Sequence, residues 1–259
     1  MEALCRAIGM PEEVTRQLLA PGICPDVRKL AHPETWEEGL REVRAALGDD
    51  PKGIGMLRCM LRCALDAWET YENLGLSREI YIDTMGCFSR FVREHRESYG
   101  EYGFDRDFWT VRQVSGTLFR IGQLEYELIQ GAVSLHIPTD VVLEPHLLRQ
   151  SWVQARGIIA NTFPDWANAP YVCHSWLLSP ALAHLLPENS RILRFQRSFR
   201  ITPLEIPCRG VIQWVFKNPR LAPEDYPENT SLQRKLKRFL LDGGCFPDAR
   251  GVLIADPFL

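Results

Sequence analysis

Apolar residues recur at helical spacing between residues 11 and 112. In residues 36–47 the apolar positions fall three or four apart, so they share one face of a helix. We expect Thr35 to cap this helix, because a threonine hydroxyl at that position can accept a hydrogen bond from an amide of the first turn. The same spacing predicts helices over residues 56–74 and 77–95. The first part of the chain is therefore predicted to be helical.

The spacing changes from helical to strand-like after residue 117. Residues 118–121, 124–129 and 133–137 form short runs that Gly-Gln and Gln-Gly sequences separate. Short β-prone runs joined by such turns are typical of an antiparallel meander.

The second of these runs alternates between apolar and acidic residues. Leu124, Tyr126 and Leu128 share one face of the strand, whereas Glu125 and Glu127 lie on the other face. We expect the acidic face of this strand to be exposed to solvent or functional.

The remainder of the chain mixes both kinds of pattern. Residues 145–162 have a helical apolar stripe, and 230–241 predict a cationic amphipathic helix. Strands are predicted over 171–178, 191–201, 211–216 and 252–255, the last at a sheet edge, with a short helix between the first two; the early part of 191–201 also fits a helix. The predicted fold class is α+β, with a helical domain over residues 1–112 and an α/β domain with a mixed, largely antiparallel sheet over 113–259.

Composition narrows the classes of function. The hydrophobic share of 46% and the charged share of 24% are ordinary for a globular protein. A net charge of -3 without a run of lysines and arginines argues against nucleic acid as a partner. No apolar stretch approaches the length of a membrane helix, so we expect no membrane partner and a cytoplasmic location.

The eight cysteines do not form the framework of a secreted domain, which favours free thiols. Cys59 and Cys63 lie one helical turn apart, but no second pair or nearby histidine completes a metal site. We therefore expect both cysteines to face the core and no metal to be bound.

Three groups of residues together resemble a known family. They are Asp83-Thr-Met-Gly-Cys-Phe-Ser-Arg-Phe-Val, then Phe119-Arg-Ile-Gly-Gln-Leu-Glu-Tyr-Glu-Leu with Leu135-His-Ile-Pro, and Cys173-His-Ser-Trp-Leu-Leu-Ser-Pro-Ala-Leu. They are similar to bacterial acyltransferase-domain proteins that join a helical N-acyltransferase N-terminal domain to a GNAT-like C-terminal domain. The resemblance spans nearly the whole chain.

The resemblance implies a binding site for acetyl-CoA or another acyl-CoA as co-substrate. In GNAT-like enzymes the coenzyme lies where two central strands separate, and amides at the start of the next helix bind its pyrophosphate. The corresponding residues here are Ile137, Pro138, Thr139, Asp140, Val141 and Val142, and Arg149 on the helix could contact a phosphate. This turn contains no glycine, and Asp140 places an anion beside an anionic ligand.

An amine must lose a proton before it attacks a thioester, so the reaction needs a base. His136, at the end of its strand, is the first candidate, and Glu125 could act through a water molecule. Ser175, His184 or Tyr126 could protonate the departing thiolate. A cysteine nucleophile is less favoured, because Cys173 and His174 are adjacent on a strand and point to opposite faces.

The predicted function is an acyl-CoA-dependent N-acyltransferase that transfers an acyl group, most simply acetyl, to a small-molecule amine acceptor. The alternative is a non-catalytic GNAT-like protein that binds another small ligand at the same place. The two hypotheses share the fold and differ in the chemistry of the turn after His136.

Overall fold

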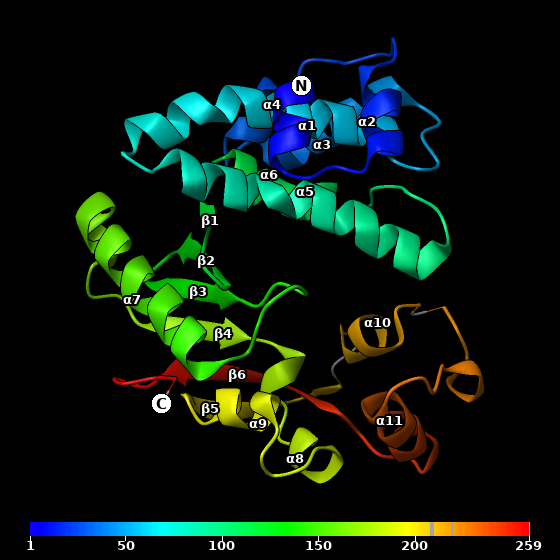
Figure 1. The fold of residues 1–259 in the computed structure, drawn as a ribbon, viewed down its shortest axis with the longest axis vertical. Helices are drawn as coiled ribbons and strands as arrows, with labels where there is room; N and C mark the ends of the chain where they lie inside the picture. The colour runs from blue at the N-terminus through cyan, green and yellow to red at the C-terminus, as the bar shows by residue number, and fades with distance from the viewer. Residues whose placement is uncertain (208–209, 219, 259) are drawn as a thin grey trace. The chain divides into compact units, whose positions relative to one another are not determined.

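The computed structural model describes residues 1–207, 210–218 and 220–258 (Figure 1). The chain divides into two compact units. The first contains Met1–Ile121 and Glu125–Leu128, and the second contains Gly122–Leu124 and Ile129–Leu259. The domain boundary expected between residues 112 and 113 stays a prediction.

The first unit is built mainly from helices. They are α1 (Glu2–Ala7), α2 (Glu12–Leu19), the 3-10 helix η1 (Arg28–Ala31), α3 (Trp36–Leu47), α4 (Ile54–Asn73), α5 (Arg78–Tyr99) and α6 (Asp107–Val114), followed by strand β1 (Leu118–Ile121). The three helices predicted from their apolar stripes are confirmed as α3, α4 and α5. No helix in the described part of the chain is long and apolar enough to cross a membrane.

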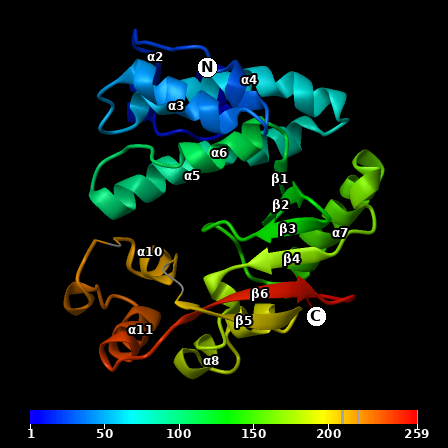
Figure 2. The ribbon, with the colours of Figure 1, turned by 180° about the vertical axis from the view of Figure 1, so that it is seen from behind.

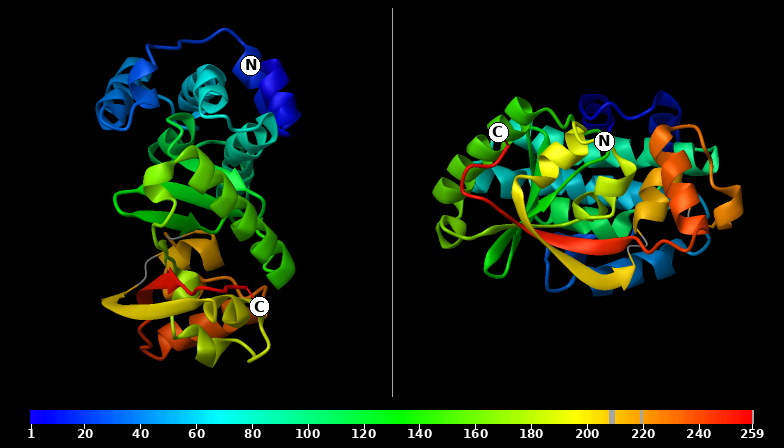
Figure 3. Two further views of the ribbon diagram at one scale, coloured as in Figure 1. Left: turned by 90° about the vertical axis from the view of Figure 1, so that its left-hand side faces the viewer. Right: turned by 90° about the horizontal axis from the view of Figure 1, so that it is seen from below.

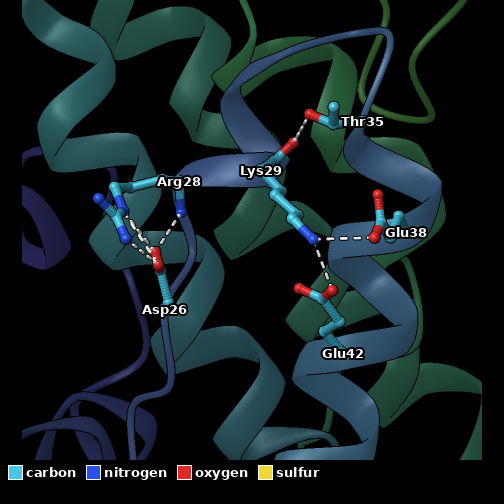
Figure 4. A network of polar contacts seen from close by, with 6 residues as sticks. All are labelled: Asp26, Arg28, Lys29, Thr35, Glu38 and Glu42. Carbon is cyan, nitrogen blue, oxygen red and sulfur yellow. Dashed lines mark hydrogen bonds and ion pairs between the residues drawn. The ribbon is translucent and has the colours of Figure 1, made fainter.

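The starts of α3 and α5 differ in how their first amides are satisfied. The Ser77 hydroxyl accepts a hydrogen bond from the Ile80 amide at 3.2 Å, so this serine caps α5. The cap expected from Thr35 is wrong, because its hydroxyl donates to the Lys29 carbonyl at 2.9 Å (Figure 4). The Lys29 ammonium in turn lies 2.9 Å from a Glu38 oxygen and 2.5 Å from a Glu42 oxygen, which ties η1 to α3.

The core of the first unit is aromatic as well as aliphatic. Tyr71 on α4 is fully buried and donates its hydroxyl proton to the Gln113 carbonyl at 2.8 Å. Its ring meets those of Tyr81 and Phe119 edge-on, at centroid distances of 5.3 and 5.4 Å. Cys59 and Cys63 are buried on α4, as the sequence predicts.

The strands follow the order β1-β2-β3-β4-β6-β5. Their bounds are β2 (Leu124–Ile129), β3 (Ala132–His136), β4 (Tyr171–His174), β5 (Phe199–Pro207) and β6 (Pro247–Leu253). The three predicted meander strands are confirmed as β1, β2 and β3. Gly122 and Gly131 have φ of +63° and +72° in the two-residue turns, a conformation that favours glycine.

The sheet is mixed and largely antiparallel, as predicted. β3 and β4 are parallel, whereas β6 is antiparallel to both β4 and β5. The strand predicted at 252–255 belongs to β6, but its expected place at the edge is wrong because β5 lies outside it. Figure 3 shows β5 and β6 running side by side.

Helix α7 (Pro145–Thr162) connects β3 to β4 and lies on one face of these strands (Figure 1). Proline suits the first helical position because its missing amide proton would be unpaired there. The predicted apolar stripe is confirmed, since its members Leu148, Trp152, Ala155 and Ile159 are all buried. A helical crossover of this kind is the usual connection between parallel strands.

Three predicted strands are partly or wholly wrong. Residues 211–216 lie in helix α10 (Gly210–Phe216), where Val211 and Val215 face a small core shared with α8 (Leu182–Leu185) and α11 (Ser231–Leu241). A short apolar run cannot be assigned to strand or helix by periodicity alone, and here burial at positions i and i+4 decided for helix.

The other partial errors lie near β4 and β5. The strand predicted over 171–178 stops at His174 and continues as the 3-10 helix η3 (Trp176–Leu178). The run from residue 191 begins as helix α9 (Arg191–Gln196) and becomes strand β5 only from Phe199, so the helical alternative was right for its early part.

Candidate active site

The carboxyl ends of the parallel strands β3 and β4 define the candidate site. Their residues pair at Val133 with Tyr171 and at Ser134 with Val172. Each strand runs on for two residues, to His136 and His174, and no further pairing joins the two strands in the described part of the chain. The carboxyl ends of parallel strands joined by a crossover helix are a common place for a ligand in α/β sheets.

His174 is held by a carboxylate from the next strand. Its Nε2 lies 2.8 Å from Oδ2 of Asp248 on β6, and Oδ1 of Asp248 accepts the Ala249 amide at 3.0 Å. When Nε2 carries the proton that it shares with Asp248, Nδ1 is left as a proton acceptor. The His174 side chain is 49% exposed, so this acceptor is accessible from solvent.

His136 and His174 end strands β3 and β4 on the same face of the sheet. The two histidines lie two residues beyond Ser134 and Val172, which are partners, and alternation puts them on the same face. His136 is half-buried. The face that carries the predicted base therefore also carries a second histidine, which the sequence argument did not select.

Cys173 points to the opposite face of β4. It is 2% exposed, and burial raises the pKa of its thiol to about 12. A thiol with this pKa stays protonated near neutral pH and is a poor nucleophile. Ser175, directly after β4, is half-buried, and its hydroxyl accepts the Leu177 amide at 3.2 Å. Its role as an acid stays a prediction.

Two backbone amides in the turn after β3 already donate hydrogen bonds within the protein. The Val141 amide donates to the Pro138 carbonyl at 3.1 Å, and the Val142 amide donates to Oε1 of Gln123 at 2.8 Å. Pro138 is buried, whereas Thr139 and Asp140 are exposed. A phosphate oxygen would have to replace the Gln123 oxygen to accept the Val142 amide.

Two arginines flank the first turns of α7. Nη1 of Arg149 lies 2.7 Å from Oδ1 of Asp256, which follows β6, and the two side chains are 41% and 59% exposed. Nη2 of Arg191, at the start of α9, lies 2.6 Å from Oε1 of Glu144, the residue before α7. Positive charge therefore lies at the helix end predicted to meet phosphates, and each arginine has a carboxylate partner.

Glu125 is not exposed, so the expectation of a solvent-facing acidic strand face is wrong. It is 3% exposed within the first unit, and its Oε1 lies 2.6 Å from Nη2 of Arg90 on α5. Glu127 is half-buried and lies 2.9 Å from Arg112. The arginines explain the error, because a buried carboxylate is tolerated when a cation pairs with it.

Tyr126 is fully buried in the same strand. Catalytic roles for Glu125 and Tyr126, like that of His184, remain predictions. Glu125 and Tyr126 are buried, whereas His184 is exposed.

Sequence reasoning did not select His174, and it missed four further residues of this region. Asp248, Gln123, Arg191 and Asp256 each contact a group that is distant in the chain, and Asp248 lies 74 positions from His174. No local pattern marks them. Only His174 carried a signal, because it shares the alternation of its strand with Cys173.

No group of three or more histidine, cysteine or acidic side chains that could hold a metal ion occurs within the described residues.

The fold is that of a two-domain class of proteins. A helical first unit is followed by a mixed sheet in which a crossover helix connects two parallel strands. Residues 1–116 match the N-acyltransferase N-terminal domain model, and residues 118–253 match the GNAT-like C-terminal domain model. The chain belongs to the family of proteins with a GNAT-like C-terminal domain, as its motifs predicted.

Solved structures of acyltransferases share this fold. One, in complex with decanoyl-CoA and teicoplanin, is 22% identical, with a TM-score of 0.80 over 97% of this chain and 86% of that one. Another, in complex with CoA and 10C-teicoplanin, is 20% identical, with a TM-score of 0.73 over 100% of this chain and 99% of that one. A comparison with curated proteins finds no match.

Proposed function

We propose that this protein is an acyl-CoA-dependent acyltransferase that acts on an amine acceptor. The observation that carries the proposal is the His174–Asp248 pair at the carboxyl ends of the parallel strands β3 and β4. Family membership and the acyl-CoA complexes of structural neighbours support the same reaction class.

In the proposed reaction, the amine nitrogen attacks the thioester carbonyl while Nδ1 of His174 takes a proton from that nitrogen. A C–N bond forms, the C–S bond breaks, and coenzyme A leaves as a thiolate that then takes a proton. Asp248 holds the imidazole through Nε2, so that the free nitrogen is the one that faces the acceptor. This mechanism transfers the role predicted for His136 to His174 on β4.

Arg149 is the residue that we propose for the coenzyme phosphates, with Arg191 as a second cation. Guanidinium groups bind phosphate oxygens through paired hydrogen bonds. The carboxylate of Asp256 occupies Arg149 in this structure, and a phosphate would replace it. The turn from Ile137 to Val142 remains the proposed position of the pyrophosphate.

One observation favours the non-catalytic alternative. The amides of Val141 and Val142 already have acceptors, so this turn does not offer the free amides of a typical pyrophosphate site. A protein that binds a different small ligand at the strand ends would show the same arrangement.

Two measurements distinguish the acyltransferase from the non-catalytic alternative: calorimetric binding and thermal unfolding. Both use coenzyme A, acetyl-CoA, octanoyl-CoA and decanoyl-CoA. A ligand at one hundred times its Kd should stabilise the folded state by about 2.7 kcal/mol. Acetyl transfer is the simplest case, and the octanoyl and decanoyl chains are included because similar solved structures contain octanoyl-CoA or decanoyl-CoA. Absence of binding by all four compounds would refute the enzyme proposal.

Release of free thiol in the presence of an amine then tests catalysis itself. We expect thiol release to depend on the amine and on His174. Binding without amine-dependent release would support the non-catalytic alternative. A cytoplasmic location stays a prediction from the sequence.

A further inference from the structure

Three residues on neighbouring strands form a row beside the candidate base. His174 on β4 lies opposite Arg250 on β6, and Arg250 lies opposite Thr202 on β5. Residues directly opposite each other in antiparallel strands point to the same face, with Cβ atoms about 4.5–5.5 Å apart. All three side chains are exposed. Figure 2 shows these strands from the side opposite α7.

A second arginine shares this face. Arg200 alternates with Thr202 on β5 and lies opposite Val252, which is 40% exposed. The face therefore carries two guanidinium groups, one directly beside His174 and one a diagonal step further.

The charges on this face are unbalanced. Neither Arg200 nor Arg250 forms an ion pair within the described part of the chain. The nearest carboxylate along β6, Asp248, is engaged by His174 and by the Ala249 amide. Glu205 on β5 lies in the stretch where the register of the β5–β6 pair shifts, between Pro203 and Pro207.

We propose that this row binds the carboxylate of the acceptor, so that the acceptor is an amine that also carries a carboxylate, such as an amino acid or a peptide. This inference rests on the proposed acyltransferase function and adds the class of acceptor. Arg250 binds the carboxylate through two parallel hydrogen bonds, and Arg200 adds positive charge. The amine then lies toward His174, which removes its proton.

Of the two arginines, Arg250 is expected to contribute more to acceptor binding, because it is nearer to His174. Arg250 is the direct cross-strand neighbour of His174, so a small acceptor can reach both groups at once. With an acceptor that has no carboxylate, the Arg250 guanidinium would stay hydrated. Such an acceptor would lose the contact with Arg250 and keep the contact with His174. Arg250 is therefore expected to govern KM for the acceptor and to leave coenzyme binding unchanged.

The test uses octanoyl-CoA with glycine, glycylglycine and glycylglycylglycine, each compared with its C-terminal amide. The three lengths vary the distance between amine and carboxylate. Arg250→Gln should raise KM for at least one acid about tenfold or more, the loss expected for a hydrogen bond to a charged group. The same variant should change KM for the matching amide less than twofold. Comparing variant with wild type for each acceptor cancels the different basicities of the amines.

Arg238→Gln is the matched control, because Arg238 on α11 is also an exposed arginine, with a side chain 86% exposed. It should change neither series. Equal effects of Arg250→Gln on acids and amides would overturn the inference, and so would a wild-type protein that acylates the amides as well as the acids. If the protein binds octanoyl-CoA but acylates none of the acids, the acceptor class is wrong while coenzyme binding stands. If it binds no acyl-CoA, the proposed function itself fails.

Discussion

Nε2 of His174 lies 2.8 Å from Oδ2 of Asp248, although 74 positions separate the two residues in the chain. The pairing of β4 with β6 brings them together, because His174 and Arg250 are cross-strand partners and Asp248 lies on the same face of β6 as Arg250. The contact orients an exposed imidazole at the end of a parallel strand pair. It is the arrangement from which the proposed chemistry follows.

Replacement of His174 by glutamine should lower kcat by about 10²- to 10⁴-fold, the usual contribution of a general base. The Kd for octanoyl-CoA should stay within about twofold of wild type, because the proposed base does not hold the coenzyme. His32→Gln, at an exposed histidine of the first unit, is the control and should retain full activity. A His174→Gln enzyme with normal kcat would return the role of base to His136.

Asp248→Asn should also lower kcat, by at least about tenfold. The asparagine amide can donate a proton to Nε2, which would place the imidazole proton on Nδ1 and remove the acceptor that the amine needs. Single-turnover measurement of acyl transfer separates this effect from binding. Asp242→Asn, at an exposed aspartate with a side chain 73% exposed, should change nothing.

Arg149 and Asp256 should act on coenzyme binding in opposite directions. Arg149→Gln should weaken coenzyme A binding about tenfold, through loss of a charge-assisted contact to phosphate. Asp256→Asn should strengthen binding about two- to fivefold, since an exposed ion pair of roughly 0.2–1 kcal/mol no longer competes. Calorimetry at low and high salt should show both effects shrinking as salt screens the charges. Weaker binding in Asp256→Asn would mean that the aspartate positions Arg149 instead of competing with phosphate.

Glu125→Gln should destabilise the protein by about 3 kcal/mol, because it leaves the buried Arg90 guanidinium without its 2.6 Å partner. Glu127→Gln is the matched control on the same strand, and its half-buried pair with Arg112 should cost about 1 kcal/mol or less. Chemical denaturation measures both values. A negligible cost for Glu125→Gln would show that Glu94, 3.7 Å from Nε of Arg90, suffices as partner.

Burial of Cys173 predicts a loss of stability at alkaline pH. Its thiol pKa rises from the usual 9.0 to about 12 on folding, so the contribution to stability is fully present below pH 9. As the pH rises from 9 toward 12, the unfolded chain loses the proton first and the folded state is penalised by about 1.4 kcal/mol for each unit. Denaturation of Cys173→Ala should show a correspondingly smaller loss between pH 9 and 10. Cys245→Ala, at an exposed cysteine, should follow the wild type.

The elements that the sequence predicted well are those with a long or well-punctuated pattern. The meander strands, α4, α5 and α7 follow from apolar spacing, and the glycines at 122 and 131 mark the turns because their φ is positive. The run at Val211–Phe216 failed because short apolar segments fit a strand or a helix equally well. Its packing against α11 decided the outcome.

For the site, the chain alone located the strand-to-helix junction after His136, and with it the class of ligand that the family resemblance implies. Local spacing also determined which residues share a face of β4. Cys173 and His174 therefore point to opposite faces and cannot form one catalytic dyad. It could not reveal that Arg90 buries Glu125, that Gln123 occupies the Val142 amide, or that Asp248 holds His174. Each of these contacts joins residues far apart in sequence, and hydrogen bonds and ion pairs act only over a few ångströms. Only the tertiary structure brings such groups within that range, which is why it, and not the pattern of the chain, moved the proposed base from β3 to β4.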